Sequence, residues 1–226
     1  MKYLRFAIMP ILVLTSIISL LIGPLYVILF FIFLSGLFIL GDYYLPQDKD
    51  KPDYSKPWIL NGLLYINLPL LLTLYFLLAW YCAGIDLFGF GNWVQSNSPF
   101  NIIEHKRNIQ FYHYIFIVLS SGLLVAGAGT VVAHELVHRT REKISMWFGN
   151  WLISLSFDMA FAIDHVYGHH KDVCLKKDSA TAQRGQSIYH FIISSSLGQF
   201  ITAYKIELRR KKPIYQNRLL QSTIRS

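Results

Sequence analysis

The sequence predicts an all-α integral membrane protein, a bundle of four transmembrane helices joined to a further helix that is interfacial or re-entrant. Hydrophobic residues make up 54% of the 226 residues and the mean hydropathy is +0.38, which is high for a soluble domain. The apolar residues form long runs rather than periodic stripes. The basic residues behind the net charge of +8 gather near the ends of these runs, where they suit anionic lipid. We therefore expect a lipid bilayer as the partner and no nucleic acid.

Four apolar runs are each close to the roughly 20 residues that a helix needs to cross a bilayer. They cover residues 6–22, 25–40, 57–83 and 111–133. The first two runs are separated only by Gly23 and Pro24, so we expect a helical hairpin. Residues 41–56 are polar and contain prolines, and residues 84–110 are rich in glycine, asparagine and serine. We expect both of these segments to be loops.

The pattern divides the chain into a transmembrane region, residues 1–133, and a histidine-rich region with a basic C-terminal segment, residues 134–226. If Lys2 and Arg5 lie in the cytoplasm, four spans return the chain to the same side at Arg139. The histidine-rich region is then predicted to lie at the cytoplasmic face of the cell inner membrane.

Five of the eight histidines lie between residues 133 and 185. His134 and His138 form an HxxxH pattern, and His165, His169 and His170 form an HxxxHH pattern. Side chains four residues apart share one face of a helix, so two such faces can converge on a metal ion.

Residues 144–163 between the two clusters are numerous enough to span the bilayer, which would put the clusters on opposite sides. A shared metal centre requires that this segment lies along the interface, re-enters the membrane or packs inside the bundle. Asn150 and Asp158 also make a lipid-exposed span unfavourable.

Besides an iron centre shared by the two clusters, two other interpretations of the histidines remain open. HELVH is also an HExxH pattern, in which two histidines bind zinc and Glu135 is the general base of a membrane metalloprotease. Five imidazoles exceed the ligands of one tetrahedral zinc, whereas imidazole also suits non-haem iron with open positions for oxygen. The third interpretation is a non-catalytic membrane scaffold.

The remaining histidines and the cysteines are not expected to bind metal. His105, His113 and His190 are isolated, and we interpret them as hydrogen-bonded structural side chains. Cys82 and Cys174 are far apart in the sequence, so the chain encodes neither a CxxC redox pair nor a rubredoxin-type iron site. Any electron carrier must be a separate protein.

Three stretches carry a resemblance to a known family: HELVHR from His134, DHVYGHHKDV from Asp164, and DSATAQRGQSIYHF from Asp178. They resemble the membrane-bound alkane hydroxylase (alkane 1-monooxygenase) branch of the integral-membrane fatty acid desaturase and hydroxylase superfamily, closely over residues 133–191 and loosely elsewhere. The resemblance implies two irons, electrons from rubredoxin or ferredoxin, and hydroxylation or desaturation of alkyl chains such as alkanes or fatty acyl lipids. By motif, the iron ligands would be His134, His138, His165, His169 and His170.

We call the HxxxH pattern of His134 and His138 the first histidine box and the HxxxHH pattern of His165, His169 and His170 the second. The sequence departs from the family pattern mildly near the second box and strongly after it. Asp164 stands where the family has glutamate, and the later histidine motifs of the family do not occur before Ser226. We therefore expect an N-terminal fragment that is incomplete alone and holds one iron or partial iron. Near the boxes, Glu135, Asp164 and Asp178 are expected to accept hydrogen bonds from the ligand imidazoles.

Overall fold

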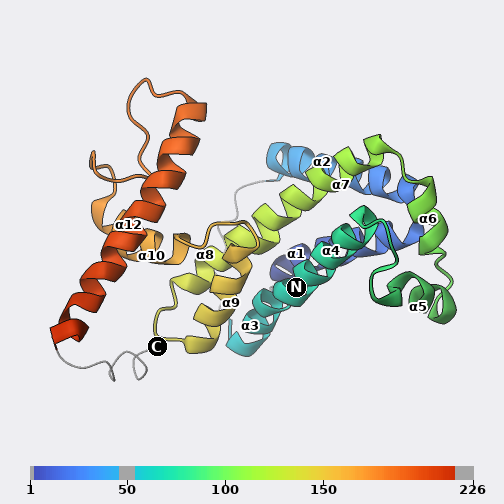
Figure 1. The fold of residues 1–226 in the computed structure, drawn as a ribbon, viewed down its shortest axis with the longest axis horizontal. Coiled ribbons are helices and arrows are strands. Elements are labelled where there is room, and N and C mark those ends of the chain that lie inside the picture. The colour runs from blue at the N-terminus through green and yellow to red at the C-terminus, as the bar shows by residue number, and fades with distance from the viewer. Residues whose placement is uncertain (1–2, 46–53, 217–226) are drawn as a thin grey trace. The chain divides into compact units, whose positions relative to one another are not determined.

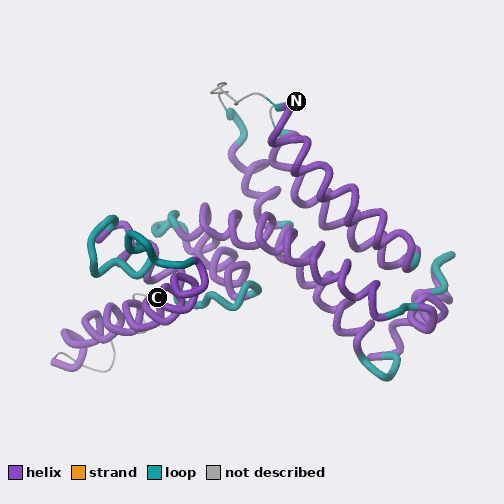
Figure 2. Tube along the Cα trace, turned by 90° about the horizontal axis from the view of Figure 1, so that it is seen from above, coloured by secondary structure: helices purple, strands orange, loops and turns teal. Residues whose placement is uncertain are grey.

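The computed structural model describes residues 3–45 and 54–216, with side chains as far as residue 210. Within these residues the chain consists of helices and connecting loops and contains no strand (Figure 2). It divides into two compact units, Met1–Ala133 and His134–Ser226, which are coloured blue to green and yellow to red in Figure 1. The predicted all-α class is confirmed.

Among the described residues, four helices are long and apolar enough to cross a membrane, the number that the sequence predicted. They are Leu4–Ile22, Pro24–Tyr44, Pro57–Cys82 and Phe111–Val137. Together with their composition, this makes the chain an integral membrane protein.

The first unit begins with the expected hairpin of α1 (Leu4–Ile22) and α2 (Pro24–Tyr44). The chain reverses at Gly23, whose φ of +142° is a conformation that only glycine adopts readily. Pro24 then starts α2, because proline fixes φ at a helical value and needs no hydrogen-bond acceptor at this position. Helix α2 extends to Tyr44, past the predicted boundary at residue 40; residues 46–53 of the predicted loop lie outside the described residues.

The third span consists of two helices, α3 (Pro57–Tyr65) and α4 (Asn67–Cys82), which meet at Ile66. Helix α1 packs against α4, and α2 packs against α7 (Phe111–Leu124). The interior of this unit contains fully buried aliphatic side chains, among them Val13, Leu34 and Leu71.

The segment from residue 84 to 110 is largely helical, so the prediction of a loop was wrong. It forms a 3₁₀ turn η1 (Leu87–Gly89), α5 (Phe90–Asn97) and α6 (Ile102–Asn108). Asp86 stabilises the start of α5, because its carboxylate accepts hydrogen bonds from the backbone N–H of Gly91 at 2.7 Å and from the Trp80 indole at 2.7 Å. Glycine and asparagine content alone did not reveal this side-chain capping.

The fourth span delivers the first histidines. It runs through α7, a π-helical stretch η2 (Val125–Val131) and α8 (Val132–Val137), and so ends beyond the predicted boundary at residue 133. His134 lies inside α8, and His138 follows its last residue. A π-helical turn shifts every following side chain around the helix axis, so it sets the direction in which His134 points.

The second unit continues with α9 (Lys143–Ser154), α10 (Phe161–Asp164), a second π-helical stretch η3 (His165–His169), α11 (His170–Asp172) and α12 (Ile188–Gln216). Residues 144–163 do not form one helix: α9 ends at Ser154, and Phe157 has a φ of +60° before α10 begins. Neither helix is long enough to span a bilayer. An interfacial or re-entrant position for this segment stays a prediction.

Candidate metal centre

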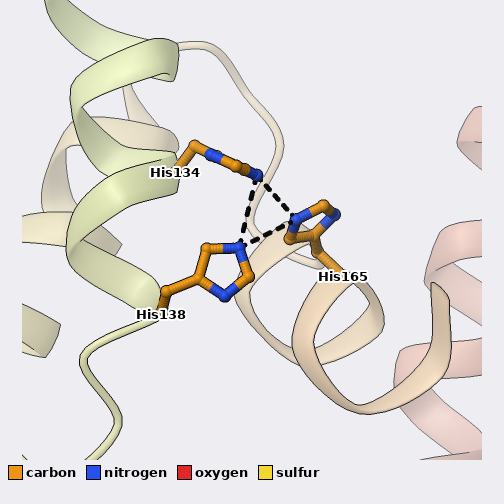
Figure 3. Close-up of side chains that lie close together, drawn as sticks. All are labelled: His134, His138 and His165. Atoms are coloured by element: carbon orange, nitrogen blue, oxygen red, sulfur yellow. Dashed lines mark hydrogen bonds between the residues drawn. The ribbon is translucent and has the colours of Figure 1, made fainter. Parts of the chain in front are cut away.

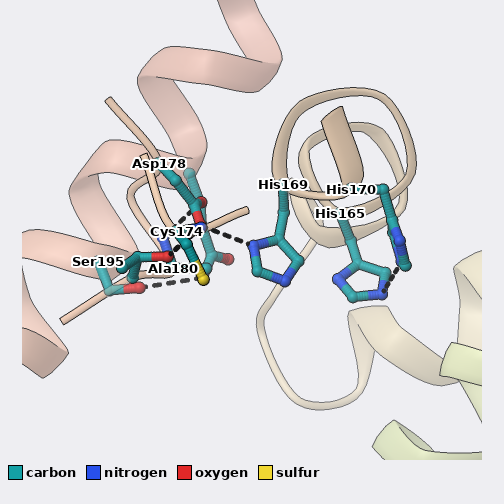
Figure 4. Close-up of polar contacts among 9 residues, drawn as sticks. His165, His169, His170, Cys174, Asp178, Ala180 and Ser195 are labelled. Atoms are coloured by element: carbon teal, nitrogen blue, oxygen red, sulfur yellow. Dashed lines mark hydrogen bonds and ion pairs between the residues drawn. The ribbon is translucent and has the colours of Figure 1, made fainter. Parts of the chain in front are cut away.

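Four imidazoles converge at one point of the second unit. The Nε2 atom of His165 lies 2.8 Å from that of His134 and 3.2 Å from that of His138, and the Nε2 atoms of His134 and His138 are 3.3 Å apart (Figure 3). His170 completes the group, with its Nε2 3.1 Å from the Nε2 of His165 (Figure 4). The two histidine boxes therefore meet, with His165 at the centre.

The π-helical turn determines which histidines of the second box meet. On an α-helix, His165 and His170 would be about 140° apart around the axis, because each residue advances by about 100°. In η3 the hydrogen bonds run from residue i to i+5 and the turn is wider, so side chains five apart lie much closer around the axis than on an α-helix. His165 and His169 share a face, as the sequence predicted, because their rings are stacked with an interplanar angle of 21°. The ring nitrogen that approaches His165 Nε2 nevertheless belongs to His170.

His169 is held from the other side by Asp178. Its Nδ1 donates to Asp178 Oδ2 at 3.0 Å, and the Ala180 N–H donates to the same carboxylate at 3.0 Å (Figure 4). The carboxylate also accepts a hydrogen bond from Thr181 Oγ1 at 2.5 Å. With the proton on Nδ1, the Nε2 lone pair of His169 is available for a metal. The expected acceptor role of Asp178 is confirmed. The His169 ring centroid lies 5.4 Å from that of His165.

The other two carboxylates have different roles. Glu135 pairs with Arg139 at 2.9 Å instead of a ligand imidazole, because side chains four apart on a helix are neighbours. Its predicted role was wrong. Asp164 is buried, and its Oδ1 lies so close to Gly168 that an added Cβ would be 2.8 Å away. Burial and the charge of Asp178 raise the pKa of Asp164 to about 6.

The surroundings of His138 and His165 lower the pKa values of these two imidazoles. Burial and then the neighbouring imidazoles of His134 and His170 lower the pKa of His165 to about 4. Burial also lowers the pKa of His138, followed by the effect of His134. Burial alone would raise the pKa of Asp178, but its hydrogen bonds hold that pKa below the ordinary value. Neutral imidazoles beside an ionised carboxylate form the protonation state that binds a metal cation.

The spacing of the nitrogens fits a metal ion. Two imidazole nitrogens bound at about 2.1 Å to one ion, with bond angles between 90° and 109°, lie about 3.0–3.4 Å apart. The His134–His138 and His138–His165 Nε2 separations, 3.3 and 3.2 Å, fall in this range, and the His134–His165 separation of 2.8 Å is slightly shorter. The ligand nitrogens of all three lie within 4.8 Å of one another. An all-imidazole set suits iron as well as zinc.

The isolated histidines have separate positions. His105 Nδ1 lies 3.0 Å from the carbonyl oxygen of Leu21, and His113 Nδ1 accepts from the Gln110 N–H at 3.0 Å. His113 thereby helps to cap α7. These contacts agree with the structural role that we predicted for both residues. His190 is exposed on α12.

Three further residues, which were not predicted from the sequence, shape the metal centre. Thr181 fixes the Asp178 carboxylate. Gly168 and Gly149 are sites of close packing: a Cβ on Gly149 would lie 3.0 Å from the side chains of Leu136 and Val137, beside the first box. An isolated glycine in a helical pattern is the signal that could have found both glycines.

The match to a known family falls on the half of the chain that contains these histidines. Residues 109–226, just over half of the chain, match the family model named fatty acid desaturase. The chain belongs to the fatty acid desaturase family. The relatives agree with this assignment. An alkane 1-monooxygenase of Pseudomonas aeruginosa is 34% identical over 109 residues, covering 46% of this chain and 28% of the relative.

Two other relatives match over longer stretches of this chain. An alkane 1-monooxygenase of Alcanivorax borkumensis is 27% identical over 75% of this chain and 36% of its own length. The xylene/toluene monooxygenase hydroxylase component of Pseudomonas putida is 30% identical over 93% of this chain and 52% of its own length. The resemblance to the alkane hydroxylase branch is confirmed, and the chain spans about half or less of the length of these relatives.

Proposed function

We propose that this chain forms part of a membrane non-haem di-iron oxygenase that uses O2 to hydroxylate or desaturate alkyl chains such as alkanes or fatty acyl lipids. The observation that carries the proposal is the convergence of the Nε2 atoms of His134, His138 and His165 from two separate boxes. The relatives that match this chain are alkane 1-monooxygenases and a xylene/toluene monooxygenase hydroxylase component. The substrate is then lipophilic and reaches the site from the bilayer.

The chain contributes five imidazoles to iron in this proposal. His134, His138, His165 and His170 lie together, and His169 is held by Asp178 through Nδ1, which leaves its Nε2 free to bind metal. When bound, iron supplies the activation of O2 that C–H cleavage requires.

The location of the site and its electron supply follow from charge and composition. Arg139, Arg141 and Lys143 follow the first box and favour the cytoplasmic face of the inner membrane. Cys82 and Cys174 are both free and exposed, and neither belongs to a CxxC pair. Electrons would therefore come from a separate rubredoxin or ferredoxin.

The zinc protease interpretation is disfavoured by the position of Glu135. The general base of an HExxH site must reach a metal-bound water. Here the carboxylate is paired with Arg139, and 58% of the Glu135 side chain is exposed. The first box therefore supplies its two imidazoles without a free base between them.

The metal content of purified variants tests the proposal. We expect iron to bind to the wild-type protein and to be lost from His165→Ala, with the exposed His190→Ala as the matched control. Unchanged metal content in His165→Ala would instead support the scaffold. Zinc in place of iron, with peptide hydrolysis abolished by Glu135→Gln, would establish the protease.

A further inference from the structure

Helix α12 is fastened to the histidine site along one face. Gly198 faces the loop that carries Asp178, where an added Cβ would lie 2.5 Å from Ser179 Cβ. One turn further along, Thr202 approaches the second box so closely that a Cβ on Gly168 would lie 3.0 Å from its methyl group. Small residues at these contacts let α12 pack directly on the elements that hold His169. This face of α12 is thus covered by other parts of the same unit.

The opposite face of α12 is apolar and exposed. Seven side chains form most of it, each with between 44% and 79% of its surface exposed, and His190 and the ion-paired Glu207 are the polar residues that share the face. The exposed Ile188 and Ile192 lie to one side of it. At about 100° per residue the seven side chains fall within an arc of about 120°, turned away from the face that packs on the histidine site. We call this face the apolar stripe: Tyr189, Ile193, Leu197, Phe200, Ile201, Tyr204 and Leu208.

The far end of α12 is basic, with Lys205 about 40° and Arg209 about 80° around the helix axis from the edge of the apolar stripe. Lys205 and Arg209 are exposed, and Glu207 is the only acidic residue between residues 188 and 210. Arg210 pairs with Glu207 at 2.7 Å and stacks over the Tyr167 ring at 4.0 Å, which ties this end of α12 to η3. A helix with one apolar face, interfacial tyrosines and added basic residues suits the surface of an anionic bilayer.

We propose that α12 lies in the plane of the membrane surface, with the apolar stripe in the headgroup and acyl boundary and with Lys205 and Arg209 against anionic phospholipid. A bilayer is adjacent to the chain in any case, because four other helices of the same chain suit membrane crossing and α12 is not among them. If the proposed oxygenase function holds, the contacts through Gly198 and Thr202 also fix the depth of the histidine site relative to the lipid chains.

Depth measurements on the full chain in vesicles test this position. Cys82→Ser and Cys174→Ser provide a background, in which Tyr189→Cys and Tyr204→Cys each receive a fluorescent label. These positions are about 22 Å apart along the helix. We expect lipids brominated at different depths to quench both labels alike, with maximal quenching about 5–10 Å inside the surface.

Two results would overturn the proposal. A difference in depth of about 20 Å between the labels would show that α12 crosses the bilayer. Absence of lipid quenching at both labels would show that protein, such as a second copy of the chain, covers the apolar stripe. These readouts involve no metal, so they are independent of the proposed oxygenase function.

Lipid composition tests the basic end of the helix. We expect vesicles with phosphatidylglycerol to increase quenching at position 204 at least two-fold over vesicles with only phosphatidylcholine. Lys205→Gln combined with Arg209→Gln should remove this difference. If the labelled protein that keeps Lys205 and Arg209 is quenched equally in both kinds of vesicle, these two residues do not bind anionic phospholipid.

Discussion

Asp178 is predicted to control metal binding through His169. Its two oxygens accept hydrogen bonds from three donors, the His169 Nδ1, the Thr181 hydroxyl and the Ala180 N–H. In Asp178→Asn a single oxygen remains. If this amide oxygen takes the place of Oδ2, His169 still donates from Nδ1 and keeps its tautomer, but to a weaker, neutral acceptor. The Ala180 N–H then loses its acceptor. In Asp178→Ala all three bonds are lost.

These differences predict a graded loss of affinity. Outer partners of ligating histidines contribute about 10- to 100-fold to metal affinity, or about 1.4–2.8 kcal/mol. We expect the metal affinity to fall about 10-fold in Asp178→Asn and about 100-fold in Asp178→Ala. The affinity is measured by titrating cobalt(II) into the metal-free protein and following the visible absorption of the bound cobalt. Asp172→Asn is the matched control, because Asp172 pairs with Lys177 at 2.7 Å and contacts no imidazole in the described structure. Wild-type affinity in Asp178→Ala would refute the reasoning.

Two further perturbations test packing and protonation. Gly168→Ala should lower the free energy of unfolding by about 1–3 kcal/mol, because the new methyl group meets the Asp164 carboxyl and Thr202. Gly62→Ala, a helical position with open space, should leave thermal stability unchanged or raised; equal effects would contradict the close packing. The metal-free protein should lose stability as pH falls from about 6.5 to about 4, because the unfolded chain protonates His165 first. His165→Gln should flatten this slope in pH-dependent thermal melts, and an unchanged slope would reject the lowered pKa.

The transmembrane helices were predictable because a single physical requirement defines them. A helix that crosses lipid needs a run of apolar residues of the right length, and such a run is visible without any knowledge of neighbours. The prediction was wrong where a side chain caps a helix that the composition did not indicate. At residues 84–110 the carboxylate of Asp86 organised a helix in a stretch whose composition indicated a loop.

The histidine motifs specified which side chains form the site but not how each one acts. Sequence spacing assumes an α-helix of constant period, and a π-helical turn has no comparable periodic signal. The ring nitrogen that approaches His165 Nε2 therefore belongs to His170 rather than His169, and His169 turns to Asp178.

The sequence by itself determined that the chain is helical, membrane-embedded and equipped with two histidine boxes, because hydropathy and residue type are local properties. Only the tertiary structure decided that the boxes meet at His165, that Glu135 pairs with Arg139 and that α12 keeps one apolar face exposed. These outcomes depend on the packing of helices distant in sequence and on the local helix type. Neither is encoded in the spacing of any one motif.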